Sequence, residues 1–88
     1  MLAVHGKVYG RVQGVFFRDN TAKKAKELGV KGWVRNVSDG SVEVSFEGED
    51  DKVEEMIAFL EQGPIMSRVD EFKYDYIEPQ GYEEFKIV

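Results

Sequence analysis

Cysteine is absent from the chain, and histidine and tryptophan each occur only once. The lack of cysteine excludes disulfides, thiolate nucleophiles and cysteine-ligated metals. No apolar run approaches the roughly 20 residues needed to cross a bilayer. The first seven residues become polar too soon for a signal peptide. We therefore expect a cytoplasmic protein that makes no contact with a membrane.

The chain is also too short for a second domain. Its 88 residues fit one domain, residues 1–88, with one modest core and no room for a large internal cofactor. The hydrophobic content of 42% and the charged content of 33% are typical of a soluble globular protein. No obvious set of metal ligands stands out. We expect neither a metal nor an organic cofactor.

The charges are divided unevenly along the chain. The net charge of −5 argues against a general nucleic-acid-binding protein. Residues 1–36 hold eight Lys or Arg and two Asp or Glu, a balance of +6, whereas residues 37–88 hold four and fifteen, a balance of −11. Most of these charges are interpreted as solvated surface. The basic segment can nevertheless provide a local positive field that attracts a small anion.

The first half of the chain predicts a helix between strands. Apolar and polar residues alternate over residues 2–9, which indicates a strand. From Phe17 to Leu28 the apolar spacing becomes four, four and three residues, as on one face of a helix, and Gly29 is a suitable end. Two further strands are expected at residues 30–37 and 42–46, joined by a hairpin that contains Asp39-Gly40.

The second half predicts another helix and two strands. Asp50 or Asp51 can cap the helix, and Asp51 with Glu54 has the spacing of a capping box. The helix has an apolar stripe and is expected to end at Gly63-Pro64. The stripe consists of Val53, Met56, Ile57 and Leu60. A strand follows at residues 68–77, with Phe72, Tyr74 and Tyr76 on one face, and a short strand lies near residues 84–88.

This order of elements indicates an α+β fold of the ferredoxin-like kind. Strand, helix, strand, strand, helix and strand, plus a short terminal strand, match the split β-α-β arrangement. We expect an antiparallel sheet with two helices on one face. The fold alone does not identify a function, because this scaffold serves many.

The segment Gly10–Arg18 connects the first strand to the first helix. Its two glycines allow the backbone to approach a ligand closely. The first turn of the helix offers unpaired N–H groups and a partial positive charge, and Arg18 adds a planar cation suited to phosphate oxygens. The segment has neither the Gly-Lys-Ser/Thr of a Walker A motif nor the glycine spacing of a dinucleotide site. It predicts a cradle for a phosphate-like oxyanion.

Two motifs resemble the signatures of the acylphosphatase family. Gly10–Arg18 reads Gly-Arg-Val-Gln-Gly-Val-Phe-Phe-Arg, and Gly32–Asn36 reads Gly-Trp-Val-Arg-Asn, followed by Gly40, Val42 and Gly48. The resemblance covers essentially the whole chain. It implies hydrolysis of a small-molecule acyl phosphate to a carboxylate and inorganic phosphate, without a metal. It further implies catalytic roles for Arg18 and Asn36 and a phosphate-binding loop made by Gln13, Gly14, Val15, Phe16, Phe17 and Arg18.

The implied reaction needs few catalytic groups. The leaving group is a carboxylate, whose conjugate acid has a pKa of about 4, so it departs without a strong general acid. Phosphoryl transfer has a loose transition state, and catalysis is mostly positioning and charge stabilisation. We expect Arg18 and the loop amides to hold the phosphate oxygens and Asn36 to orient the attacking water.

Two residues depart from the usual form of the first motif. Position 16 is Phe, where many family members have a small residue, and Asp19 stands where an aromatic residue is frequent. Phe16 is expected to narrow the mouth of the site. Asp19 is expected to weaken its positive field.

Simpler interpretations remain for each of these residues. Arg18 could be a surface ion-pair partner, and Asn36 could be a turn-former before the hairpin. His5 is expected to be an ordinary half-buried histidine. The acidic residues at the start of the second helix more often act as caps than as metal ligands. A covered sheet face is a better explanation of the Phe72, Tyr74 and Tyr76 stripe than a base-stacking platform.

Two functions from different classes are therefore retained. The first is a metal-free acyl-phosphate hydrolase that works as a monomer without nucleic acid or membrane partners. The second is a non-catalytic anion-binding or regulatory module on the same scaffold.

Overall fold

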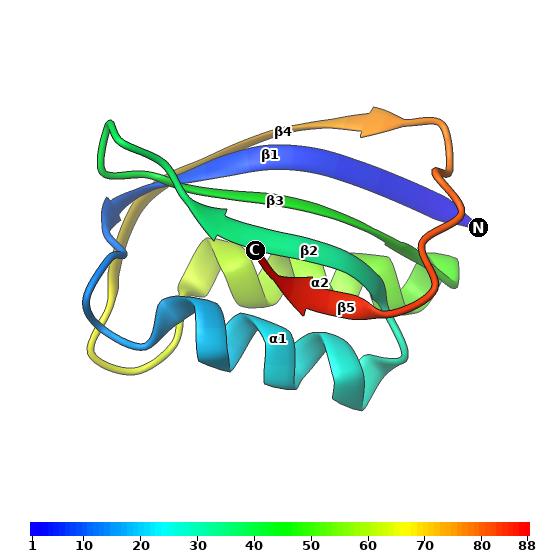
Figure 1. The fold of residues 1–88 in the computed structure, drawn as a ribbon, viewed down its shortest axis with the longest axis horizontal. Helices are drawn as coiled ribbons and strands as arrows, with labels where there is room; N and C mark the ends of the chain where they lie inside the picture. Colours follow the sequence, from blue (N-terminus) through cyan, green and yellow to red (C-terminus); the bar gives the residue numbers. More distant parts are fainter.

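The computed structural model describes all 88 residues as one sheet with two helices against one of its faces (Figure 1). The helices are α1 (Phe17–Leu28) and α2 (Asp50–Gln62). The strands are β1 (Leu2–Arg11), β2 (Lys31–Asn36), β3 (Val42–Gly48), β4 (Arg68–Ile77) and β5 (Phe85–Ile87). The predicted order of elements is confirmed. Neither helix is both long and apolar enough to cross a membrane.

The strands lie in the order β4-β1-β3-β2-β5. The first four are paired antiparallel, as expected for a ferredoxin-like sheet. The short β5 pairs parallel to β2, which makes the complete sheet mixed. It can do so because residues 78–84 carry the chain from the β4 edge to the opposite edge (Figure 1).

One hydrophobic core fills the space between the sheet and the helices. The apolar stripe of α2 is fully or almost fully buried, as predicted: Val53, Met56, Ile57 and Leu60. From α1, Phe17 and Ala25 are 1% and 0% exposed. α1 thus contributes to the core from its first residue, which holds the start of this helix against the sheet.

The aromatic stripe of β4 belongs mainly to this covered face. Phe72 and Tyr74 lie opposite Val8 and Gly6 of β1 and pack against the core. Only Tyr76, at 54% exposure, extends beyond it. The expectation of a covered sheet face is confirmed for two of the three rings.

Both helices end as predicted and α1 begins as predicted, but the start of α2 differs from the prediction. At the end of α1, the N–H groups of Gly29 and Val30 donate to the carbonyl oxygens of Lys26 and Ala25 at 3.3 and 2.8 Å, a Schellman motif with Gly29 at a φ of 72°. The predicted capping box of α2 is wrong. Glu49 is the N-cap, and no side chain caps the helix.

The reason is a shift of the helix start by one or two residues. Asp50 and Asp51 already lie in the first turn, where their charges favour the positive end of the helix dipole but their side chains do not reach the cap position. Asp50 instead pairs with the N-terminal ammonium of Met1 at 3.2 Å.

The sheet face away from the helices buries three polar side chains of β3. Glu43, Ser45 and Glu47 are 8%, 2% and 3% exposed. The Glu47 carboxylate accepts three backbone N–H groups of the β4–β5 connection, from Gln80 at 2.5 Å, Gly81 at 3.0 Å and Tyr82 at 3.1 Å. These bonds hold the segment that carries β5 to its edge.

Candidate active site

The loop between β1 and α1, residues 12–16, contains two residues with a left-handed backbone conformation. Gly14 has a φ of 74° and Phe16 a φ of 59°, both in the left-handed region. Left-handed residues that alternate with ordinary ones turn successive N–H groups towards a common point and form an anion-binding nest. Gly14 adopts this conformation without steric cost, whereas Phe16 does so despite its side chain.

The N–H groups of this loop are free to bind a ligand. Those of Gly14, Val15 and Phe16 donate to no other group of the protein. The first turn of α1 closes on the Phe16 carbonyl oxygen, which accepts from Asn20 N at 3.1 Å and from Asn20 Nδ2 at 3.0 Å. No side chain caps the start of α1. The partial positive charge at the N-terminal end of this helix therefore remains available to an anion in the loop.

A cavity of about 260 Å³ opens beside this helix start. Arg18 from the first turn of α1 and Asn36 from the last position of β2 both line it. The complete wall is Val12, Gly14, Phe16, Phe17, Arg18, Asp19 and Asn36. The structure thus brings together two of the residues selected from separate motifs, 18 positions apart in the sequence.

Two of the predicted loop residues do not contribute to this wall. The Val15 side chain is 6% exposed and belongs to the core. The Gln13 side chain turns to the β2–β3 hairpin, where its Nε2 donates to the carbonyl oxygens of Val37 at 2.7 Å and Ser41 at 2.8 Å. Nothing in the sequence pattern indicated this link between the loop and the hairpin. It fixes the loop relative to the strand end that carries Asn36.

The charged residues around the cavity differ in their partners. Arg18 is partly buried and takes part in none of the salt bridges of the structure, which does not favour the surface ion-pair interpretation. Arg35, next to Asn36, donates to the Glu43 carboxylate at 2.6 Å on the open face of the sheet. Asp19 is exposed on the cavity wall.

Glu43 is shared between Arg35 and His5. The His5 Nε2 lies 2.6 Å from Glu43 Oε2, and the His5 side chain is 44% exposed, as expected for a half-buried histidine. Burial acts to raise the pKa of Glu43, but the hydrogen bonds from His5 and Arg35 outweigh it and hold this pKa below the ordinary 4.5. The pair therefore stabilises the open face rather than the cavity.

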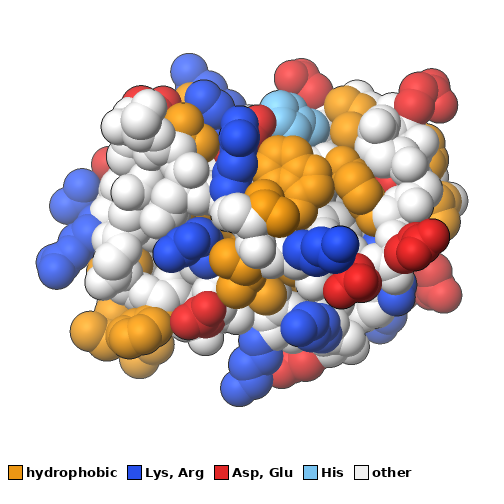
Figure 2. All heavy atoms as spheres, viewed as in Figure 1, with side chains coloured by type: hydrophobic (Ala, Val, Ile, Leu, Met, Phe, Trp, Pro, Cys, Tyr) orange, Lys and Arg blue, Asp and Glu red, His pale blue; other side chains and the backbone are white.

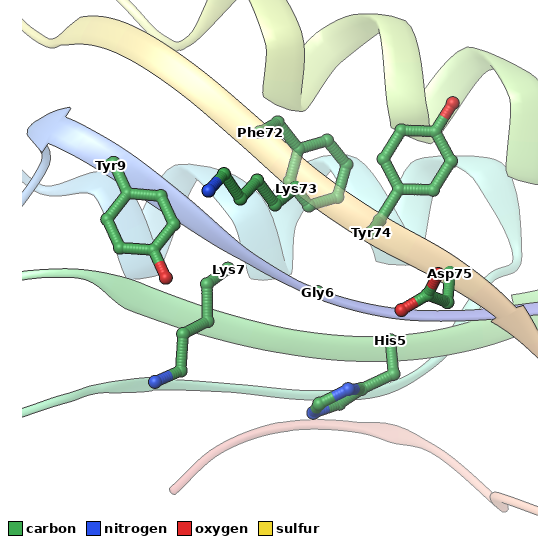
Figure 3. A pocket seen from close by; sticks show the side chains of 8 residues that line it. All are labelled: His5, Gly6, Lys7, Tyr9, Phe72, Lys73, Tyr74 and Asp75. Atoms are coloured by element: carbon green, nitrogen blue, oxygen red, sulfur yellow. The ribbon is translucent and has the colours of Figure 1, made fainter.

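A larger hollow of about 580 Å³ lies elsewhere, across β1 and β4 (Figure 3). Its floor is Gly6, and the side chains of Lys7 and Phe72 lie on opposite sides of the β1 and β4 ribbons in Figure 3. It contains neither a helix start nor Arg18 or Asn36. The smaller cavity is the better candidate because it alone combines free backbone N–H groups with an arginine and an amide.

No group of three or more His, Cys, Asp or Glu side chains has a geometry that could hold a metal ion. The acidic residues at the start of α2 instead lie along its first turn.

Comparison with known proteins gives consistent results. The family model for acylphosphatase matches residues 4–87. An acylphosphatase from Thermococcus kodakarensis is 48% identical over 84 residues, which cover 96% of this chain and 92% of the relative. The crystal structure of the acylphosphatase from Bacillus subtilis is similar with a TM-score of 0.95 and 32% identity, covering 100% and 99% of the two chains. A structure of an acylphosphatase from Coxiella burnetii is similar with a TM-score of 0.94 and 38% identity, covering 99% of this chain and 92% of that one.

Proposed function

The chain belongs to the acylphosphatase family, whose enzymes hydrolyse acyl phosphates, and we propose that residues 1–88 form one catalytic domain with Arg18 and Asn36 at the reacting phosphate. The observation that carries this proposal is the shared cavity. Arg18 and the loop N–H groups provide an anion site, and Asn36 adds a polar side chain from a different element. An anion site alone would only bind the phosphate group, whereas this combination can also direct a water molecule at its phosphorus atom.

The phosphoryl group is held by the loop and the helix start. The free N–H groups of Gly14, Val15 and Phe16 donate to its non-bridging oxygens, and the α1 dipole favours its negative charge. The Arg18 guanidinium adds charge-assisted hydrogen bonds and stabilises the charge that develops as the bond to the carboxylate breaks. Gln13 contributes by its backbone and by holding the loop to the hairpin.

Asn36 orients the attacking water. A side-chain amide can accept two hydrogen bonds and donate two, so it can fix a water molecule, but it is a poor base. Its role is therefore positioning in line with the leaving carboxylate rather than removal of a proton.

The leaving group explains why this short list of residues suffices. A carboxylate departs without a general acid because its conjugate acid has a pKa of about 4. The reaction is then limited by positioning and charge stabilisation, which the loop and Arg18 supply without a metal. We propose a monomeric, cytoplasmic enzyme acting on a small acyl phosphate, with no nucleic-acid partner in view of the net charge of −5.

Phosphate release from benzoyl phosphate in the presence of EDTA tests this proposal against a non-catalytic anion-binding module. The wild type is expected to release phosphate with EDTA present. The Asn36→Ala variant should bind inorganic phosphate as the wild type does, by calorimetric titration, but lose about 10²–10³ in kcat. Phosphate binding by a wild type that releases no phosphate would support the binding module instead, and activity only after added metal would contradict the metal-free mechanism.

A further inference from the structure

Phe16 occupies an unusual position for a large apolar side chain. It is 71% exposed, lines the cavity with Arg18 and Asn36, and belongs to none of the core contacts. Figure 2 shows hydrophobic side chains at the surface near the end of the molecule where, in Figure 1, the loops before α1 and after α2 lie. The exposed large apolar residues of these loops are Phe16, Ile65 and Met66.

The backbone holds the Phe16 ring outwards at a cost in local conformation. A left-handed φ of 59° is unfavourable for a bulky side chain, and glycine or asparagine would adopt it more easily. Asn20 fixes this conformation through two hydrogen bonds to the Phe16 carbonyl oxygen. Since the ring contributes nothing to the core, a purely structural role does not account for it.

The cavity wall also carries an exposed anionic side chain. Asp19 is exposed and forms no salt bridge, so no cationic side chain is paired with it at the mouth. Phe16 and Asp19 line the same cavity as the residues proposed to hold the phosphate, so both are available to contact an acyl group that extends from this phosphate towards solvent.

We propose that Phe16 and Asp19 select the acyl group: the site accepts neutral, apolar and preferably flat acyl groups and disfavours those that carry a negative charge. This rests on the proposed function, since it concerns the substrate of the same site. The Phe16 ring offers a face on which an aromatic or extended apolar acyl group can lie. The Asp19 carboxylate repels a second anion on the acyl group by Coulomb interaction.

The test compares ratios of kcat/KM for matched pairs of substrates. Benzoyl phosphate and acetyl phosphate differ in apolar area, and p-carboxybenzoyl phosphate and benzoyl phosphate differ in charge. Phe16→Asn, which keeps a residue tolerant of the left-handed backbone, should lower the benzoyl-to-acetyl ratio about 3- to 10-fold. Asp19→Asn should raise the carboxybenzoyl-to-benzoyl ratio about 3- to 10-fold.

Ile65→Asn is the matched control, because Ile65 is 88% exposed on the neighbouring loop but does not line the cavity. Its ratios should equal those of the wild type. A second measurement uses the inhibitors benzoylphosphonate and acetylphosphonate, which are not turned over. Phe16→Asn should weaken the binding of benzoylphosphonate relative to that of acetylphosphonate, seen as a higher ratio of their inhibition constants.

The outcomes separate this proposal from the one on which it rests. Wild-type hydrolysis of these substrates with ratios that stay within about twofold in both cavity variants would overturn the selection by Phe16 and Asp19 alone. Failure of the wild type to hydrolyse any of them would overturn the proposed function and, with it, this inference. A change as large in Ile65→Asn as in Phe16→Asn would assign the effect to surface hydrophobicity in general and would also overturn it.

Discussion

The Nε2 atom of Gln13 lies 2.7 Å from the carbonyl oxygen of Val37, the residue that follows Asn36. The same nitrogen donates to Ser41 at 2.8 Å on the other side of the hairpin. A single side chain thus joins the loop proposed to hold phosphate to the strand end proposed to hold water. The distance between these two parts of the site depends on Gln13.

Gln13→Ala is expected to lower both stability and activity. Two hydrogen bonds are lost, which corresponds to about 1–2 kcal/mol in the free energy of unfolding. Because the loop and Asn36 are then no longer fixed to each other, kcat/KM should fall about 10-fold or more. Urea unfolding and steady-state kinetics with benzoyl phosphate measure the two effects. Lower stability with unchanged kcat/KM would reduce Gln13 to a structural role.

Gly14→Ala, in the loop before α1, and Gly29→Ala, at the C-cap of α1, form a matched pair. Their φ angles are 74° and 72°, and an added Cβ would meet no atom within 4 Å at either position. Each substitution should therefore cost about 1 kcal/mol through left-handed strain. Only Gly14 lines the cavity, so only Gly14→Ala should also lower kcat/KM, by about 10- to 100-fold. Equal losses of activity in the two variants would contradict a ligand-binding role for the loop.

Glu47→Gln tests the anchoring of the β4–β5 connection. The buried carboxylate accepts three backbone N–H groups, and an amide cannot replace all of these bonds, so the free energy of unfolding should fall by about 2–3 kcal/mol. Glu47 pairs with Lys31, at the end of β2 away from Asn36, so kcat should change less than twofold.

The control for this variant is Glu71→Gln. Glu71 is exposed, and its Oε1 lies 3.9 Å from Lys73 Nζ in a loose ion pair at the surface. Its effect in denaturant titrations should stay within about 0.5 kcal/mol. A Glu47→Gln protein as stable as this control would disprove the anchoring role.

Stability at low pH should depend on Glu43. Hydrogen bonds from His5 and Arg35 outweigh burial and lower the folded-state pKa of Glu43 below 4.5. A carboxyl with a lowered folded-state pKa stabilises the fold above its unfolded-state pKa, and this contribution is lost as the pH falls through the folded-state value. The melting temperature should therefore decrease below about pH 4.5, and the decrease should be smaller in Glu43→Gln. An equal decrease of the melting temperature with falling pH in the wild type and in Glu43→Gln would contradict this assignment.

The elements near the site could be predicted from sequence because local patterns determine them. The change of period at Phe17 marks the start of α1, and Gly29 marks its end. That Arg18 and Asn36 line one cavity followed from two motifs on elements whose order indicates the fold. The Gln13 contact could not be predicted, because it depends on how far the hairpin extends past the loop.

The buried acidic residues of β3 were missed for a similar reason. Val42, Val44 and Phe46 alternate with Glu43, Ser45 and Glu47, which predicts one apolar face and one solvated face. Glu47 is instead covered by a connection more than 30 residues later in the chain. The capping box of α2 was wrong for a more local reason, since the N-cap lies at Glu49, two residues before the predicted Asp51.

The rate of phosphate release from benzoyl phosphate by Arg18→Ala tests the central claim most directly. Removal of a guanidinium that stabilises the transferring phosphoryl group should lower kcat/KM by about 10³–10⁵ and raise KM, in a protein whose unfolding transition matches that of the wild type. A folded Arg18→Ala protein with kcat/KM within about twofold of the wild type would contradict the proposed site.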